Sequence, residues 1–159
     1  MHPAPAGANP LIYTFLVFAH ILTALIAVGF NFTYVAWIMR GTRDVESLPF
    51  ALKGVKFLDD YIANPLYIAA GVTGVLMILM GKSVASWLWV AIVIYLIDMI
   101  AAYLVYTPLL GRQIRTLSEK GTASVEYKAI AGRSNLVGAL LGVGALVIVA
   151  LKIFEPTFW

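Results

Sequence analysis

Four long runs of apolar residues dominate this sequence, and short polar stretches separate them. A transmembrane helix needs roughly 20 predominantly apolar residues to cross the hydrocarbon core of a bilayer, and each run reaches about that length. The expected spans are residues 11–39, 61–80, 87–110 and 134–154. The pattern therefore predicts an all-α polytopic membrane protein, an antiparallel bundle of four transmembrane helices.

The polar remainder predicts a simple domain organisation. Residues 1–10 contain three prolines and no Lys or Arg, which indicates a flexible leader. Residues 11–159 are expected to form a single four-span membrane domain. In the first polar stretch, 41–60, apolar residues recur at helical spacing, at Leu48, Leu52, Val55 and Leu58. That spacing favours a short amphipathic helix lying on the membrane surface.

Composition supports the membrane assignment. The chain of 159 residues is 62% hydrophobic and only 12% charged, whereas soluble domains are about half apolar and a quarter charged. A lipid bilayer is therefore the expected surrounding. The sequence contains no cysteine, which excludes a disulfide framework and a thiolate metal site.

The distribution of basic residues predicts an orientation. Nine of the eleven lie in the two longer polar stretches, as Arg40, Arg43, Lys53, Lys56, Arg112, Arg115, Lys120, Lys128 and Arg133. The opposite side has only Lys82 and Lys152. Because short cytoplasmic loops are enriched in Lys and Arg, we expect loops 40–60 and 111–133 to be cytoplasmic, with both termini outside the bacterial cytoplasmic (inner) membrane. The same asymmetry explains the net charge of +3 without a nucleic-acid partner.

Two ionisable residues fall deep inside the expected spans. His20 lies about 14 Å and Asp98 about 16 Å from the same membrane face, at 1.5 Å of rise per residue. A carboxylate at the bilayer centre costs about 2.5–3.5 kcal/mol on insertion scales, so Asp98 should face other helices or a water-filled pocket. The two residues therefore share a layer of the bundle, with Tyr95 one turn from Asp98 on the same helix.

Two interpretations of this pair remain open. In the structural one, His20 donates a hydrogen bond to Asp98 and joins two helices. In the functional one, His20 is an axial haem ligand, a metal ligand for haem or copper, or part of a proton relay, and Asp98 and Tyr95 orient it. Asn31, nearer the cytoplasmic side, is a weaker candidate for the same site.

Small residues in two spans allow close contact between helices. They are Gly71 and Gly74 in the second span, and Gly138, Gly142 and Gly144 in the fourth. Such spacing is typical of tightly packed membrane helices. It serves either packing within the bundle or a seam with a partner, so a homodimer or a larger membrane complex is a candidate assembly.

Several segments resemble a bacterial family of predicted integral membrane proteins, domain of unknown function 2269. The resemblance rests on Phe18-Ala-His20, Asn31-Phe-Thr-Tyr34, Leu48-Pro-Phe-Ala-Leu52, Ala63-Asn-Pro-Leu-Tyr67 and Tyr106-Thr-Pro-Leu-Leu-Gly-Arg-Gln113. It covers nearly the whole chain after the leader. It implies a membrane protein but no particular activity.

More distantly, the layout is similar to CopD-type copper-resistance proteins and HemJ-type protoporphyrinogen oxidases. These are helix bundles with a histidine midway along the first span, where this chain has His20. The resemblance implies haem b held by that histidine. HemJ-type proteins also carry a lysine early in the third span, where this chain has Trp89, Val90 and Ala91, so the resemblance does not carry over the oxidase activity.

The sequence therefore predicts a membrane protein that binds haem or a porphyrin at His20 in a redox or cofactor-handling role. One alternative is a non-enzymatic accessory or assembly subunit of a membrane complex. Another is proton or ion passage through His20 and Asp98. Whether the protein is an enzyme stays open at this stage.

Overall fold

The computed structural model describes residues 4–159, and this part of the chain is all helical. The elements are α1 (Pro10–Arg43), α2 (Leu48–Leu58), the π-helix η1 (Asp59–Ala63), α3 (Asn64–Leu79), α4 (Ser86–Ala101), the π-helix η2 (Ala102–Tyr106), α5 (Thr107–Lys120) and α6 (Val125–Phe154). The segments α2, η1 and α3 join into one continuous rod, as do α4, η2 and α5. The described chain thus forms four long rods, each long and apolar enough to cross a membrane, which confirms the predicted fold class.

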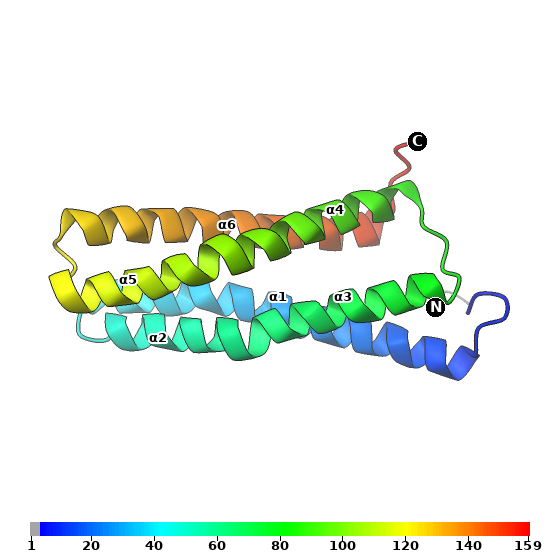
Figure 1. The fold of residues 1–159 in the computed structure, drawn as a ribbon, viewed down its shortest axis with the longest axis horizontal. Helices are drawn as coiled ribbons and strands as arrows, with labels where there is room; N and C mark the ends of the chain where they lie inside the picture. The colour runs from blue at the N-terminus through cyan, green and yellow to red at the C-terminus, as the bar shows by residue number, and fades with distance from the viewer. Residues whose placement is uncertain (1–3) are drawn as a thin grey trace.

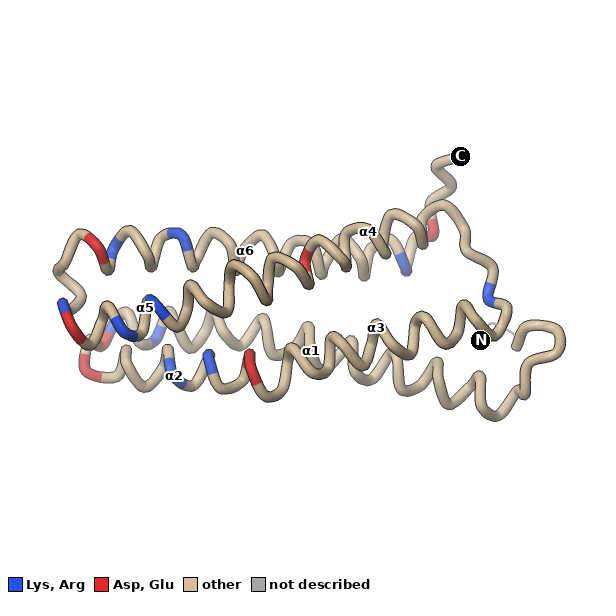
Figure 2. The backbone as a smooth tube through the Cα atoms, in the orientation of Figure 1, with Lys and Arg blue, Asp and Glu red and all other residues tan. Residues whose placement is uncertain are grey.

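The four rods run antiparallel, and α1 begins where α6 ends (Figure 1). We call this the terminal end, and it also holds the 80–85 connection. The opposite end, with the short 44–47 and 121–124 connections, we call the basic end. Figure 2 shows most Lys and Arg residues in the half of the bundle toward that end. The charge asymmetry of the sequence thus becomes an asymmetry of the folded molecule.

The rods extend beyond the expected spans, and the polar stretches 41–60 and 111–133 are mostly helix. Their amphipathic faces explain the difference. The predicted amphipathic helix exists as α2, but it does not lie apart on the membrane surface, because Leu48, Leu52 and Val55 are buried in the bundle core. Its apolar face packs against α1 and α5, and only four-residue turns remain between the rods at the basic end.

Local sequence sets the ends of these helices. Asn9 caps α1, since its side chain accepts hydrogen bonds from the amides of residues 11 and 12, and Pro10 occupies the first turn. Ser124 caps α6 in the same way through the amide of Tyr127. At the end of α5, Gly121 adopts a φ of +71°, a conformation that a residue without a side chain adopts without steric cost.

Each π-helix directly precedes a proline-containing turn. Pro65 follows η1, and Pro108 follows η2, each as the second residue of the next α-helix. Proline lacks the N–H that would bond to the residue four positions earlier, and its ring crowds that carbonyl. A widened i→i+5 turn relieves the conflict without breaking the rod. Both prolines therefore lie just after a widened turn within a continuous rod.

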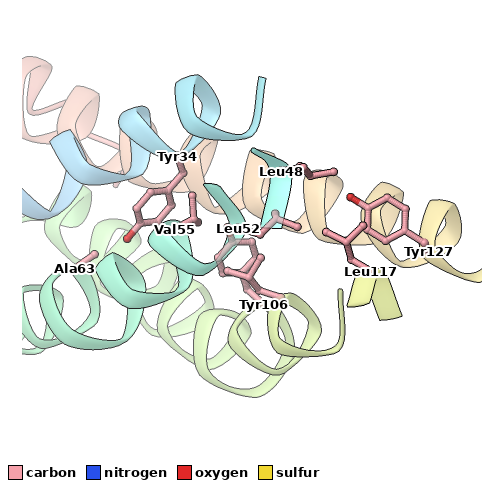
Figure 3. Packing of buried hydrophobic residues seen from close by; sticks show 9 residues of the cluster. Tyr34, Leu48, Leu52, Val55, Ala63, Tyr106, Leu117 and Tyr127 are labelled. Carbon is pink, nitrogen blue, oxygen red and sulfur yellow. The ribbon is translucent and has the colours of Figure 1, made fainter. Parts of the chain in front are cut away.

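The main apolar core lies toward the basic end. Its buried members come from all four rods (Figure 3): Tyr34, Leu48, Leu52, Val55, Ala63, Tyr106, Leu110, Leu117 and Tyr127. A smaller cluster of Trp87, Ala91 and Leu151 joins α4 to α6 near the terminal end. The main core therefore packs all four rods together at the basic end. Toward the terminal end, α1 packs on α3 and α4 packs on α6.

Candidate functional site

A large cavity separates the two helix pairs, α1 with α3 and α4 with α6. Its volume is about 1440 Å³, larger than the roughly 300–1,000 Å³ of ordinary small-molecule pockets. Most of its wall is apolar, with side chains from all four rods, and a few polar groups interrupt it. Among them are His20, Asn31, Tyr95 and Asp98, so all four predicted site residues line one space.

His20 is held by α3 and not by Asp98. Its Nδ1 lies 2.8 Å from the Ala70 carbonyl oxygen and 3.2 Å from the Thr73 hydroxyl. A carbonyl only accepts, so Nδ1 carries the proton and donates it. In the neutral imidazole, Nε2 then keeps its lone pair, and it has no hydrogen-bond partner within residues 4–159. The hydrogen bond from His20 to Asp98 that the structural interpretation required is not formed.

Asp98 lies on α4, against α6. A Cβ added to Gly144 would collide with both carboxylate oxygens and with the carboxyl carbon of Asp98. Asp98 accepts no hydrogen bond from any residue of the described chain, and it lines the cavity. No hydrogen bond between Asp98 and His20 therefore supports the predicted role of Asp98 in orienting the imidazole. The Asp98 carboxyl group can instead contact a molecule bound in the cavity.

Tyr95 and Asn31 contact the second rod. The Tyr95 hydroxyl donates to the Tyr67 carbonyl oxygen at 3.0 Å. Asn31 donates through its side-chain amide to the Tyr67 hydroxyl at 2.7 Å. Both residues thus meet at Tyr67 of α3, and neither touches the imidazole of His20. Tyr67 was not among the predicted site residues, because the sequence distinguishes this tyrosine only by its position near a helix start.

Four glycines make room for these side chains. The pairs are Gly71 with Tyr95, Gly74 with His20, Gly138 with Tyr106, and Gly144 with Asp98. An added Cβ would lie 3.3 Å from the His20 ring at Gly74 and 3.1 Å from the Tyr106 ring at Gly138. The small residues therefore serve contacts within the bundle. Gly142 differs, because nothing lies within 4 Å of the Cβ it lacks.

Two lysines line the cavity near the terminal end. Lys82 follows the end of α3, and Lys152 lies in the last turn of α6. Lys152 pairs with Glu155, and its ammonium group lies 5.2 Å from the ring centre of Trp87. These are the two basic residues outside the expected cytoplasmic loops, and they place positive charge at one end of an apolar space.

Polar residues line the opposite, basic-end part of the cavity, and sequence reasoning gave most of them no role in a site. Asp59 and Asn64 are 4% and 3% exposed, and Tyr34 is 5% exposed. Thr107 donates to Asp59 at 2.7 Å, and Asn64 donates to the same oxygen, Oδ2, at 3.2 Å. The sequence does not indicate that Asp59 and Asn64 are buried, and only the fold shows it.

The described residues contain no group of three or more His, Asp or Glu side chains arranged to hold a metal ion. Within residues 4–159, His20 is the one imidazole that lines the cavity. A methionine thioether can be a second haem ligand, and Met77 and Met99 line the cavity whereas Met80 does not. Met77 belongs to α3, the helix that also binds the His20 ring, whereas Met99 belongs to α4, on the other helix pair.

The fold and the cavity define a class: a polytopic, all-helical membrane protein with a mostly apolar cavity between its helices. The family described as predicted integral membrane protein (DUF2269) matches residues 14–156, and the chain belongs to that family. No curated protein and no solved structure matches the chain. The similarity to CopD-type and HemJ-type proteins thus stays a prediction from sequence.

Proposed function

We propose that this protein binds a haem or a related porphyrin in the cavity between its two helix pairs, with His20 Nε2 as an axial ligand. The observation that carries the proposal is the hydrogen bond from Nδ1 to the Ala70 carbonyl oxygen. Histidines that bind metals usually donate their other N–H to a carbonyl or carboxylate, which fixes the ring and the tautomer. Here that role falls to α3, and Nε2 remains for a ligand.

The cavity suits a flat, mostly apolar ring with acidic substituents. Its volume and apolar wall accommodate the macrocycle. Lys82 and Lys152 would pair with the acidic groups, which places those groups toward the terminal end. Met99, on the opposite helix pair, is the candidate second ligand from this chain. A bound haem would supply one-electron redox chemistry, and this chain would supply its orientation, a histidine ligand and a mostly apolar surrounding.

The test is the visible spectrum of the protein purified in mild detergent, before and after titration with haemin. We expect a Soret band that saturates with added haemin and that His20→Ala removes. The chain provides a matched control in its other histidine, His2, which belongs to the expected leader and precedes the first expected span. His2→Ala should leave the spectrum unchanged. A wild-type protein that stays colourless and takes up no haemin would overturn the proposal.

A colourless but stable protein would favour the alternative of an accessory or assembly subunit. The hydrogen bonds of His20 to α3 support that alternative, because they also join two helices. The two proposals predict different effects of haemin on the thermal stability of the protein. A purely structural His20 would change thermal stability on substitution and would not depend on haemin.

Proton or ion passage is the second alternative, and the carboxylates at the cavity favour it. Asp98 and Asp59 both line the cavity. Reconstitution into liposomes with a pH-sensitive dye tests the idea. Passage predicts a proton flux that Asp98→Asn reduces severalfold. A flux that is equal in Asp98→Asn and the wild type would remove this alternative.

A further inference from the structure

A second set of polar side chains lies at the contact between η1 and the start of α5, away from His20. Thr107, directly after η2, donates to Asp59 of η1, and Asn64, directly after η1, donates to the same oxygen. Asn64 also lies 3.4 Å from the Thr107 hydroxyl. Widened helical turns of this kind occur frequently at functional sites. The three side chains join the two rods that carry the π-helices.

The Asp59 carboxylate is only half satisfied. Both hydrogen bonds go to Oδ2, and Oδ1 accepts none from residues 4–159. Asp59 lines the cavity, while its neighbour Asp60 does not and pairs with Lys56. A charge buried in a protein interior needs an opposite charge or several hydrogen bonds. Among the described residues, Asp59 has two hydrogen bonds and no ion-pair partner.

Tyr34 supplies an independent sign of a missing partner. Its hydroxyl is buried and makes no hydrogen bond, and buried polar groups almost always have one. Figure 3 shows the Tyr34 ring pointing from α1 toward the segment that carries Val55 and Ala63. Asp59 lies four residues after Val55 and four before Ala63, so it occupies the same face of that helix.

We propose that these residues bind one monovalent cation through oxygen ligands. The candidate ligand atoms are the oxygens of four groups: Asp59 Oδ1, the Tyr34 hydroxyl, the Thr107 hydroxyl and the Asn64 side-chain carbonyl. All are oxygens, which suit hard cations and not zinc or copper. A single carboxylate balances a single positive charge, whereas calcium sites generally recruit several carboxylates. Sodium and potassium share this chemistry, and the experiment distinguishes them.

The test is equilibrium binding of radioactive sodium to the purified protein, with rubidium as the probe for potassium. We expect saturable binding of one of these ions, displaced by the unlabelled ion. The same ion should raise the melting temperature relative to choline at equal ionic strength, because a ligand stabilises the state that binds it. Absence of saturable binding for both probes in the wild type would overturn the proposal.

Matched variants assign the site. Asp59→Asn should abolish the binding, and Asp60→Asn, which changes the neighbouring carboxylate outside the cavity, should preserve it. Tyr34→Phe keeps the buried ring, so it tests the hydroxyl without disturbing the packing, and it should weaken binding severalfold. Tyr61→Phe, at a residue that is 70% exposed, is its control. Equal loss in the Asp59 and Asp60 variants, or displacement by magnesium or calcium alone, would contradict the assignment.

The site does not depend on a haem, and the measurements separate the two. A colourless protein that binds sodium would leave this inference standing. A protein with a Soret band and no cation binding would remove it and leave the proposed function intact.

Discussion

Asp98 of α4 occupies the space that a side chain at Gly144 of α6 would fill. A carboxyl group in the interior of a membrane protein thus fits against a neighbouring helix because that helix has no side chain at the contact. The contact also fixes where the carboxyl group lies, on the wall of the cavity that His20 lines from the other helix pair.

Substitution of this glycine should therefore destabilise the protein. In Gly144→Ala the added methyl group must displace Asp98 or push α4 away, and overpacking of this kind costs about 1–3 kcal/mol. Thermal unfolding in detergent, followed by circular dichroism, measures the change. Gly142→Ala is the control, because its methyl group enters open space and alanine in a helix is favoured over glycine by about 1 kcal/mol. Equal stabilisation of both variants would contradict the Asp98 contact.

The pair Asn31 and Tyr67 should couple α1 to α3. Its hydrogen bond is 2.7 Å long, and interhelical hydrogen bonds in membranes average about 0.6 kcal/mol, with a maximum near 1.7 kcal/mol. A double-mutant cycle of Asn31→Ala and Tyr67→Phe should return a coupling free energy of that size. Strictly additive effects of the two substitutions would show that the bond contributes nothing to stability.

The orientation of the chain in the membrane is directly testable, since the sequence contains no cysteine. Single cysteines at Glu46 and Ala123, in the two turns of the basic end, should be protected from a membrane-impermeant thiol reagent in intact cells. A cysteine at Ser83, in the connection at the terminal end, should react. Both expectations follow from the excess of Lys and Arg in cytoplasmic loops. The reverse labelling pattern would refute the predicted orientation.

The sequence was sufficient for the fold class because lipid imposes a strong pattern. Four apolar runs of this length leave few alternatives to four transmembrane helices. The lengths of the rods were not predictable in the same way, since α2 and α5 are amphipathic and their placement depends on a tertiary contact. Leu52 and Leu110, both 0% exposed, meet in the core, and an amphipathic helix that buries such residues in a bundle looks the same in sequence as one that lies on a membrane surface.

The site was partly predictable for a similar reason. His20 and Asp98 stand out in the sequence because ionisable groups are rare in apolar runs. Both residues line the cavity. Their partners were not predictable, because a backbone carbonyl such as that of Ala70 leaves no mark in the sequence. Asp59 was missed since it sits at the edge of an apolar run, where carboxylates are ordinarily solvated. Its burial follows from the packing of η1 in the bundle, where Asp59 accepts a hydrogen bond from Thr107 of α5, and that contact leaves no mark in the sequence.

Chemical rescue tests most directly the proposed role of His20 Nε2 as a haem ligand. In His20→Gly the cavity loses the imidazole and the hydrogen bond to Ala70 but gains space for a free imidazole molecule. Haemin-titrated His20→Gly should lack the Soret band of the histidine-ligated wild type, and added imidazole should restore it in a saturable manner, while 2-methylimidazole, which is hindered at the ligating nitrogen, should restore it less. A Soret band that is identical in the wild type and in His20→Gly, with or without imidazole, would contradict the claim.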